Sequence, residues 1–178
     1  GGSIFPFLIM LLMKPAMENA EAFAAGRELP NLITITSLDI VFRPEFVICI
    51  CALLCKNERI KSIGKFSIAQ ALLLVTEPIT FGLPIVFNVY MLIPIFIYPI
   101  LGHIALFACQ MAGIVSYPRA GFMFGLPIFF DAYVQAGISG VIFKVISTIV
   151  AIILTMPFMN AYAKSLEKQD KEETKENN

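Results

Sequence analysis

The chain has 178 residues, of which 58% are hydrophobic and 15% are charged, and its mean hydropathy is +0.81. Water-soluble domains average about 45–50% apolar and about 25% charged residues, and a fold of this size has too little interior to hide the surplus. The 13 basic and 13 acidic side chains cancel, so no excess of positive charge indicates nucleic-acid binding. The composition therefore predicts an integral membrane protein.

Residues 4–25 are predicted to form one helix. The apolar beginning, 4–13, is shorter than the roughly 20 residues that cross a bilayer, so the more polar second half must complete the helix and face protein or an interface. Turn-forming residues indicate that 26–37 is a connection. Because the chain opens Gly1-Gly2-Ser3 without an initiator methionine, we expect it to be incomplete or truncated.

A second apolar stretch, 38–55, is interrupted by Arg43-Pro44-Glu45. Proline lacks the backbone N–H and disfavours helix at the residue before it. This stretch is therefore either a broken helix or a loop leading into a helix that starts near Glu45. The short segment 56–65 is rich in lysine and arginine, and short basic loops stay on the cytoplasmic side of a membrane. We expect it to be such a loop.

The next apolar stretch, 66–88, is punctuated by Glu77-Pro78, Gly82 and Pro84. A plain spanning helix does not carry this pattern, whereas a re-entrant hairpin tolerates it where protein shelters the backbone or the backbone lines a wet cavity. The stretch that follows, 89–115, is long and almost uncharged. We expect a spanning helix there, bent at its prolines.

A second punctuated stretch, 122–137, is predicted to be a second hairpin, and 138–163 a spanning helix. The last residues, 164–178, have little apolar surface, so we expect a disordered, solvated tail. If the basic loop and the tail are both cytoplasmic, two full crossings lie between them and the hairpins enter from opposite faces. The predicted fold is an all-α, multi-pass membrane domain over 1–163, with spanning helices and two re-entrant helical hairpins, followed by a cytoplasmic tail.

Two segments of the chain repeat each other. Residues 81–90 read FGLPIVFNVY and residues 124–133 read FGLPIFFDAY, so that Asn88 corresponds to Asp131. Pairs of Gly- and Pro-interrupted apolar segments are typical of transporter binding sites, because broken helices expose half-helix ends and free backbone groups. The alternative is chance, since both segments draw on few apolar residue types.

Glu77 is the strongest candidate for a functional residue. It follows the apolar run 71–75, at what we expect to be membrane depth, where a carboxylate is costly and therefore faces a cavity or a partner. As a carboxylate it can accept a hydrogen bond from a sugar hydroxyl. The structural alternative is an acid that only fixes the turn of the hairpin.

Other polar residues in the apolar stretches have weaker claims. Asp131 repeats the argument for Glu77 in more polar surroundings, and Asn88 either binds a solute or caps a helix. Lys144 is expected to extend its ammonium to an interface. His103 either relays protons or binds substrate, or it packs as a hydrogen-bonded side chain. The cysteines within 49–55 do not share one helix face, so we expect them to pack, and we predict no metal and no other cofactor.

The segment 77–88, EPITFGLPIVFN, resembles the signature of the IIC membrane subunit of bacterial phosphotransferase-system sugar transporters, in the lactose/cellobiose (diacetylchitobiose) branch. The basic stretch 61–68, the end of the last helix at 157–164 and the Gly-Gly-Ser opening are similar to the same family. The resemblance covers about 60–168 well. It implies the transport domain in the C-terminal part of a IIC permease.

That resemblance implies a permease of the bacterial inner membrane that carries a disaccharide-type sugar inward and presents its hydroxyl for phosphorylation. In the family the phosphoryl donor is a cysteine of a separate IIB subunit, which works with IIA, and we expect a homodimer. Glu77 would contact the sugar near the hydroxyl to be phosphorylated. We hypothesise that two hairpin tips, one with Glu77 and one with Asp131, line a central sugar site. The full set of expected sugar contacts is Glu77, Thr76, Gly82, Asn88, Gly125 and Asp131.

Two other interpretations are open. One is a truncated or regulatory membrane subunit that binds a partner without transporting alone. The other is a membrane-embedded enzyme in which Glu77 and His103 act as acid and base, which requires both residues at one cavity.

Overall fold

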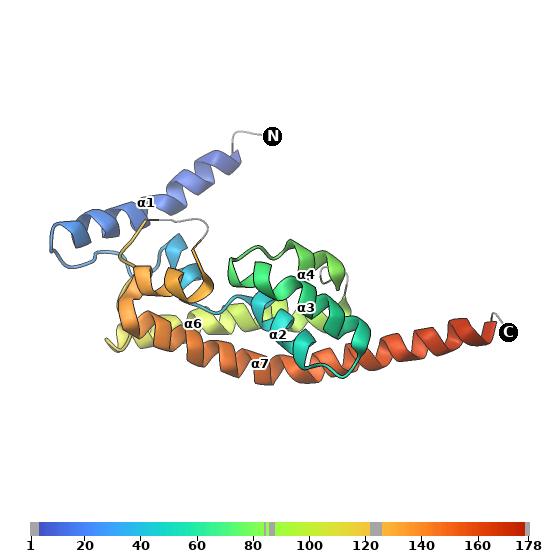
Figure 1. The fold of residues 1–178 in the computed structure, drawn as a ribbon. Coiled ribbons are helices and arrows are strands. Elements are labelled where there is room, and N and C mark those ends of the chain that lie inside the picture. Colours follow the sequence, from blue (N-terminus) through green and yellow to red (C-terminus); the bar gives the residue numbers. More distant parts are fainter. Residues whose placement is uncertain (1–3, 84, 86–87, 122–125, 177–178) are drawn as a thin grey trace. The chain divides into compact units, whose positions relative to one another are not determined.

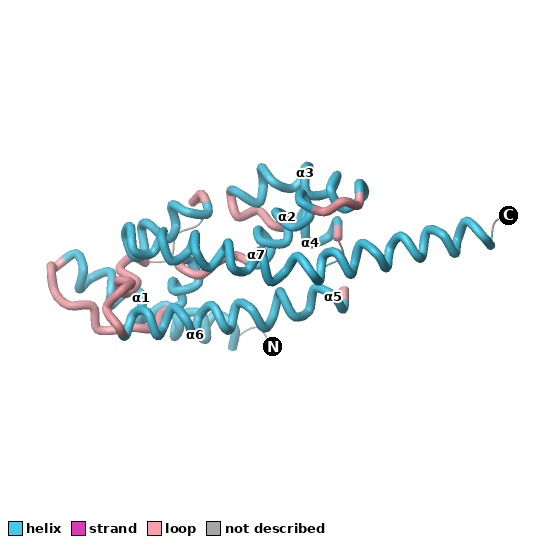
Figure 2. Tube along the Cα trace, turned by 90° about the horizontal axis from the view of Figure 1, so that it is seen from below, coloured by secondary structure: helices cyan, strands magenta, loops and turns pink. Residues whose placement is uncertain are grey.

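A computed structural model describes residues 4–83, 85, 88–121 and 126–176. These residues form helices joined by loops, and no strand occurs among them (Figures 1 and 2). Within the described ranges, two helices are long and apolar enough to cross a membrane, Val89–Met111 and Ile128–Gln169. The all-α membrane fold expected from the sequence is thus confirmed in its secondary structure.

The chain divides into two compact units, which are described separately. The first unit comprises Gly1–Phe42 and Ile100–Ser147, and the second comprises Arg43–Pro99 and Thr148–Asn178. The single membrane domain expected over 1–163 stays a prediction.

The first unit contains α1 (Ile4–Ala24), the short 3-10 helix η1 (Ile35–Asp39), most of α6 (Tyr98–Met111) and the beginning of α7 (Ile128–Glu176). Helix α1 confirms the predicted first helix. The fully buried Asn19 connects it to two loops: its amide nitrogen donates to the carbonyls of Asn31 (2.7 Å) and Pro118 (2.6 Å). Its amide oxygen accepts the Asn31 N–H at 2.9 Å. One buried side chain therefore joins three segments of this unit.

Helix α7 is broken at Gly137, where φ is 66° and ψ is −153°, a backbone region open essentially to glycine alone. The arm before the break folds back on the arm after it. A Cβ added at Gly140 would lie 2.7 Å from Ala136 Cβ and 2.8 Å from the Ala132 carbonyl oxygen. The turn at Gly137 thus lies at the end of the stretch 122–137 predicted as the second hairpin, and the long helix predicted from 138 supplies its other arm. In the structure, the second hairpin consists of the arm 128–136 and the start of that long helix.

Arg119 hydrogen-bonds to the last carbonyl groups of the helical arm that begins at Ile128. Its guanidinium donates to the carbonyls of Val134 (3.0 Å) and Tyr133 (2.9 Å), and its backbone N–H donates to Gln135 O (2.9 Å). Carbonyls at a helix end have no partner within the helix. Arg119 supplies these partners, which explains how the helix can stop at a glycine inside an apolar segment.

The second unit contains α2 (Pro44–Leu54), α3 (Glu58–Leu72), α4 (Glu77–Gly82), α5 (Val89–Leu92), the π-helical turn η3 (Ile93–Ile97) and the rest of α7. Helix α2 starts at Pro44, so the second alternative for this stretch is correct: a loop leads into a new helix. Proline suits the first position of a helix, where its missing N–H would have no partner. Pro94 lies in η3, where the missing N–H disturbs the α-helical pattern.

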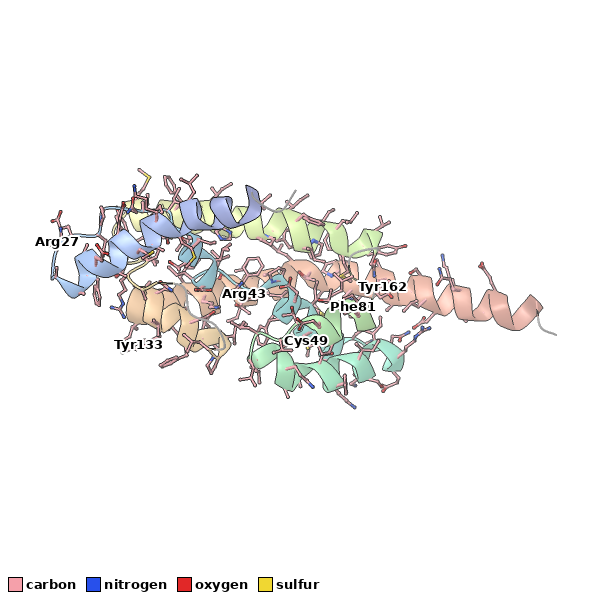
Figure 3. All side chains as sticks on the ribbon, turned by 90° about the horizontal axis from the view of Figure 1, so that it is seen from above. Arg27, Arg43, Cys49, Phe81, Tyr133 and Tyr162 are labelled. Carbon is pink, nitrogen blue, oxygen red and sulfur yellow. The ribbon has the colours of Figure 1, made fainter. Side chains whose placement is uncertain are left out.

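Helices α2 and α3 pack closely at Gly64. A Cβ there would lie 3.0 Å from the Leu53 backbone nitrogen, and the Cys49 thiol lies 3.5 Å from the Gly64 carbonyl oxygen. Figure 3 shows Cys49 on α2. The cysteines of this region, Cys49, Cys51 and Cys55, are free and buried, and no group of metal-binding side chains is found among the described residues. The packing role predicted for these cysteines is confirmed.

The cytoplasmic loop expected over 56–65 is wrong in its secondary structure, because α3 already starts at Glu58. Asn57 explains the difference. Its side-chain oxygen accepts the N–H groups of Arg59 (3.1 Å) and Ile60 (3.2 Å), which have no partner within the helix. The basic residues therefore lie on the first turns of a capped helix.

Replacing Asn57 by alanine is expected to destabilise the protein by about 1 kcal/mol, because the cap of α3 is lost. Thermal melting in detergent measures this as a slightly lower midpoint. Asn57→Asp should retain most of the stability, since a carboxylate caps equally well. An unchanged midpoint in Asn57→Ala would show that the cap contributes nothing.

The tail predicted to be disordered from residue 164 is helical, because α7 continues through Glu176. Disorder was predicted because the segment has little apolar surface to bury. Its Lys, Glu and Gln residues nevertheless favour helix, and opposite charges four residues apart stabilise it, at Glu167 and Lys171 and at Lys168 and Glu172. The described tail is therefore an extension of the last helix.

Candidate functional site

Helices α3 and α4 confirm the first predicted hairpin, with its tip at 73–75. The N–H groups of Leu73 and Val75 both donate to the Gln70 carbonyl, at 3.0 and 2.9 Å. Leu74 between them has a φ of 61°, which is uncommon for a residue with a side chain. Such strain persists only where the surroundings enforce it, and it tends to collect at binding sites.

Glu77 is the first residue of α4 and is exposed. Its negative charge stabilises the start of the helix through the helix dipole, as the structural alternative requires. The helix is also tied by Thr80, whose N–H (3.0 Å) and hydroxyl (2.8 Å) both donate to the Thr76 carbonyl. Thr76 and Glu77 thus lie side by side just past the strained tip, with the carboxylate open to a partner.

Gly82 ends α4 and has a structural explanation of its own. A Cβ at this position would lie 2.7 Å from Ile63 Cγ2, so glycine allows α4 to approach α3. The predicted sugar contact at Gly82 stays a prediction.

Asn88 is buried, with 7% of its surface exposed, and it caps α5: its side-chain oxygen accepts the Tyr90 N–H at 3.0 Å. Of the two alternatives for Asn88, solute binding or helix capping, capping is therefore correct for its side-chain oxygen. The amide nitrogen is also buried and has no hydrogen-bond partner among the described residues. A buried donor without a partner is costly, so the predicted sugar contact at Asn88 stays a prediction that concerns this nitrogen.

Asp131 lies in the first unit and is paired with Lys144. The Lys144 ammonium is 2.6 Å from both carboxylate oxygens and 2.9 Å from the Asp39 carbonyl oxygen. The exposed fractions of the two side chains are 0% for Lys144 and 3% for Asp131. The expectation that Lys144 extends to an interface is wrong, because a buried carboxylate on the other arm of the hairpin holds its charge.

The two repeated segments are alike in sequence but differ in local structure. In the first copy a helix begins after Asn88, at Val89, whereas in the second a helix already begins at Ile128, before Asp131. Asn88 therefore caps a helix, while Asp131 lies in the first turn of one. Gly125 lies outside the described residues. The shared sugar site expected for Glu77 and Asp131 stays a prediction.

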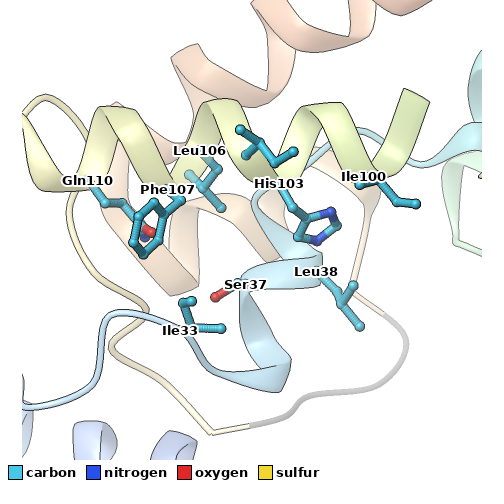
Figure 4. Close-up of a pocket in the computed structure, with 9 residues that line it drawn as sticks. Ile33, Ser37, Leu38, Ile100, His103, Leu106, Phe107 and Gln110 are labelled. Carbon is cyan, nitrogen blue, oxygen red and sulfur yellow. The ribbon is translucent and has the colours of Figure 1, made fainter. Parts of the chain in front are cut away.

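His103 lines an apolar pocket of about 510 Å³ in the first unit (Figure 4). Three of the lining residues are polar, and the other six are Ile33, Leu38, Ile100, Ile104, Leu106 and Phe107. Sugar sites need several convergent hydrogen-bonding groups, so this lining is better suited to an apolar chain than to a sugar. The acid and base pairing of His103 with Glu77 stays a prediction.

Sequence reasoning missed the partnership of Lys144 with Asp131. A signal was present: one lysine in an apolar helix follows an aspartate by thirteen residues, with Gly137 near the midpoint. Thirteen residues of straight helix span about 20 Å at 1.5 Å per residue. The two groups can pair only if the chain folds back at the glycine.

No family model matches the chain. Among curated proteins, it is 29% identical over 161 residues to the lichenan permease IIC component of Bacillus subtilis, covering 85% of this chain and 36% of that protein. It is 25% identical over 166 residues to the oligo-beta-mannoside-specific EIIC component of a PTS system from the same organism, covering 88% of this chain and 38% of that protein. The chain thus spans well under half the length of these relatives.

A solved structure shares the fold. The chain superposes on the crystal structure of the IIC component from the N,N'-diacetylchitobiose-specific phosphotransferase system with a TM-score of 0.82 and 30% sequence identity. The match covers 90% of this chain and 39% of that transporter.

Proposed function

The chain resembles the IIC membrane components of bacterial phosphotransferase systems, and from this premise we propose that it is a sugar permease subunit. In this proposal it binds a disaccharide-type sugar, of the cellobiose or diacetylchitobiose kind, and presents one hydroxyl for phosphorylation by a IIB partner that works with IIA. Support comes from the names of the relatives and from the shared fold. The chain itself supplies the groups that hold the sugar, and the phosphoryl donor belongs to the partner.

Glu77 carries this proposal. An exposed carboxylate stands at the first residue of α4, directly after a hairpin tip with a strained backbone. A carboxylate accepts hydrogen bonds from sugar hydroxyls, and a site built to accept them rejects solutes that lack the hydroxyl. It would also hold the reactive hydroxyl in one orientation for transfer. Glu77 is therefore the proposed catalytic residue of the site as well as a sugar ligand.

Asn88 and Thr76 are the proposed supporting ligands in the same unit. The Asn88 amide nitrogen is a buried donor without a described partner, and Thr76 offers a half-buried hydroxyl beside Glu77. Gly82, where α4 approaches α3 closely, is a further proposed sugar contact. Gly125 is the proposed contact of the second hairpin, and Asp131 was predicted from the sequence to be another.

We place the protein in the bacterial inner membrane as a multi-pass homodimer with a cytoplasmic C-terminus. The basic start of α3 and the lysines after Ala163 favour the cytoplasmic side.

The alternative function is a membrane subunit that binds a partner without transporting alone. In that case the chain would still contribute sugar ligands, but only in complex with another polypeptide.

The test uses the chain reconstituted in lipid vesicles with radiolabelled cellobiose or diacetylchitobiose and with phosphorylated IIB. The proposal predicts saturable binding of one of these sugars and release of the phosphorylated sugar only when IIB is present. Maltose, which has the other glycosidic configuration, serves as the control. Saturable binding without phosphorylation would favour the partner-dependent alternative, and the absence of saturable binding would contradict both.

A further inference from the structure

The buried pair of Asp131 and Lys144 has a role that the proposed function does not yet use. The ammonium of lysine carries three donors, and three acceptors surround it: both carboxylate oxygens of Asp131 at 2.6 Å and the Asp39 carbonyl at 2.9 Å. The Asp131 carboxylate also accepts the Ala132 N–H at 2.6 Å. The charges are thus held by each other and by the backbone.

This network connects three segments of the first unit. Lys144 lies on the long arm of α7, Asp131 on the arm before Gly137, and Asp39 at the end of η1. Gln135 extends the network: its amide nitrogen is 3.4 Å from Asp39 Oδ2 and 3.4 Å from the Gly121 carbonyl. The arm before Gly137 is therefore fixed at two points along its length.

Burying two charges costs free energy, because both side chains lose their hydration. Two buried charges are often no more stabilising than apolar side chains of similar volume, yet removing one partner leaves a charge without compensation and is strongly destabilising. A buried pair is therefore better explained by the geometry it fixes than by the stability it adds. Here the fixed geometry is that of the second hairpin, which carries the second repeated segment.

We propose that Lys144 is a positioning residue for sugar binding: through Asp131 and Asp39 it holds the second hairpin in the arrangement that the sugar requires. This inference rests on the proposed function. It assigns Asp131 a role through Lys144, which differs from the direct sugar contact predicted from the sequence, and the two roles can be separated by experiment.

The experiment compares Lys144→Met, Asp131→Asn and the double variant in the reconstituted chain, with Lys164→Met as the control. Lys164 lies on the same helix but is exposed. The hydrogen-exchange rate of the arm 128–136 measures whether Lys144 and Asp131 still hold that arm. The dissociation constant for the sugar that binds to the wild-type protein measures whether the binding site is intact. Both single variants are expected to speed exchange and to weaken sugar binding by at least about tenfold, because the arm that carries the second repeated segment is no longer held.

The double variant distinguishes the two roles. If Asp131 acts only through Lys144, removing Asp131 in the Lys144→Met background costs no further sugar affinity, so the double variant should exchange and bind like the single variants. If the double variant binds sugar much more weakly than Lys144→Met, the carboxylate itself contacts the sugar and the proposal for Lys144 is overturned. It is also overturned if the single variants alter exchange without altering affinity, or alter neither.

The failure of the proposed function would look different. The wild-type protein would then bind none of the tested sugars, and the proposed role of Lys144 in sugar binding would be contradicted as well. The exchange data would still show whether Lys144 holds the arm, because that measurement needs no sugar.

Discussion

Replacing Glu77 by glutamine is expected to raise the dissociation constant for the sugar roughly 10- to 150-fold, because a hydrogen bond to a charged group contributes about 1.5–3 kcal/mol. Glutamine keeps the shape of the side chain but accepts more weakly. The change should also abolish most of the IIB-dependent phosphorylation, since the hydroxyl is no longer oriented. Binding of radiolabelled sugar to reconstituted vesicles measures the first effect, and the yield of phosphorylated sugar measures the second.

Glu45→Gln is the matched control for this substitution. Glu45 also stands in the first turn of a helix of the second unit, beside a proline. Both substitutions therefore remove the same favourable interaction with a helix dipole, which contributes about 0.3–1 kcal/mol. Only Glu77→Gln should affect the sugar. Equal losses of affinity in the two variants would mean that Glu77 acts on the fold alone.

The substitution Gly140→Ala is expected to destabilise the protein by about 3 kcal/mol or more, at the upper end of what overpacking costs. The new Cβ would lie 2.8 Å from the Ala132 carbonyl oxygen and 2.7 Å from Ala136 Cβ. A backbone carbonyl and a Cβ cannot rotate away, so the two arms of the second hairpin must separate. The melting midpoint in detergent should fall by roughly 6–12 °C for a chain of this size.

Gly121→Ala provides the control for this prediction. Nothing lies within 4 Å of a Cβ at Gly121, so its midpoint should match that of wild type. If Gly140→Ala melted at the same temperature as Gly121→Ala, the arms would not be packed as described, and the fold-back at Gly137 would be wrong.

Local rules in the sequence were enough to find most of the helices. Pro44 indicated a break at this point, because proline disfavours helix at the residue before it, and of the two alternatives the start of a new helix is the correct one. The Glu77-Pro78 interruption likewise indicated that the apolar stretch around it is a hairpin. Both signals act within a few residues, so they are visible without the fold. Asn57 is a comparable signal that was overlooked, because the basic residues after it indicated a loop.

Contacts between distant residues could not be predicted in the same way. Lys144 was expected at an interface because a lysine in an apolar helix usually extends there, and its partner lies across a break that helical periodicity does not describe. Asn88 and Asp131 matched in an alignment of the repeats, yet their helices begin at different positions. Sequence similarity of apolar segments therefore did not determine where the helices start.

The most direct test of the account is whether sugar covers the carboxylate of Glu77. A water-soluble carbodiimide with an amine modifies exposed carboxylates, and peptide mass spectrometry can follow Glu77 and Glu58, both exposed, separately in the reconstituted chain. With saturating cellobiose or diacetylchitobiose, whichever binds, modification of Glu77 should slow at least about tenfold, while Glu58 reacts at an unchanged rate. Modification of Glu77 at the same rate with and without a bound sugar would contradict the account.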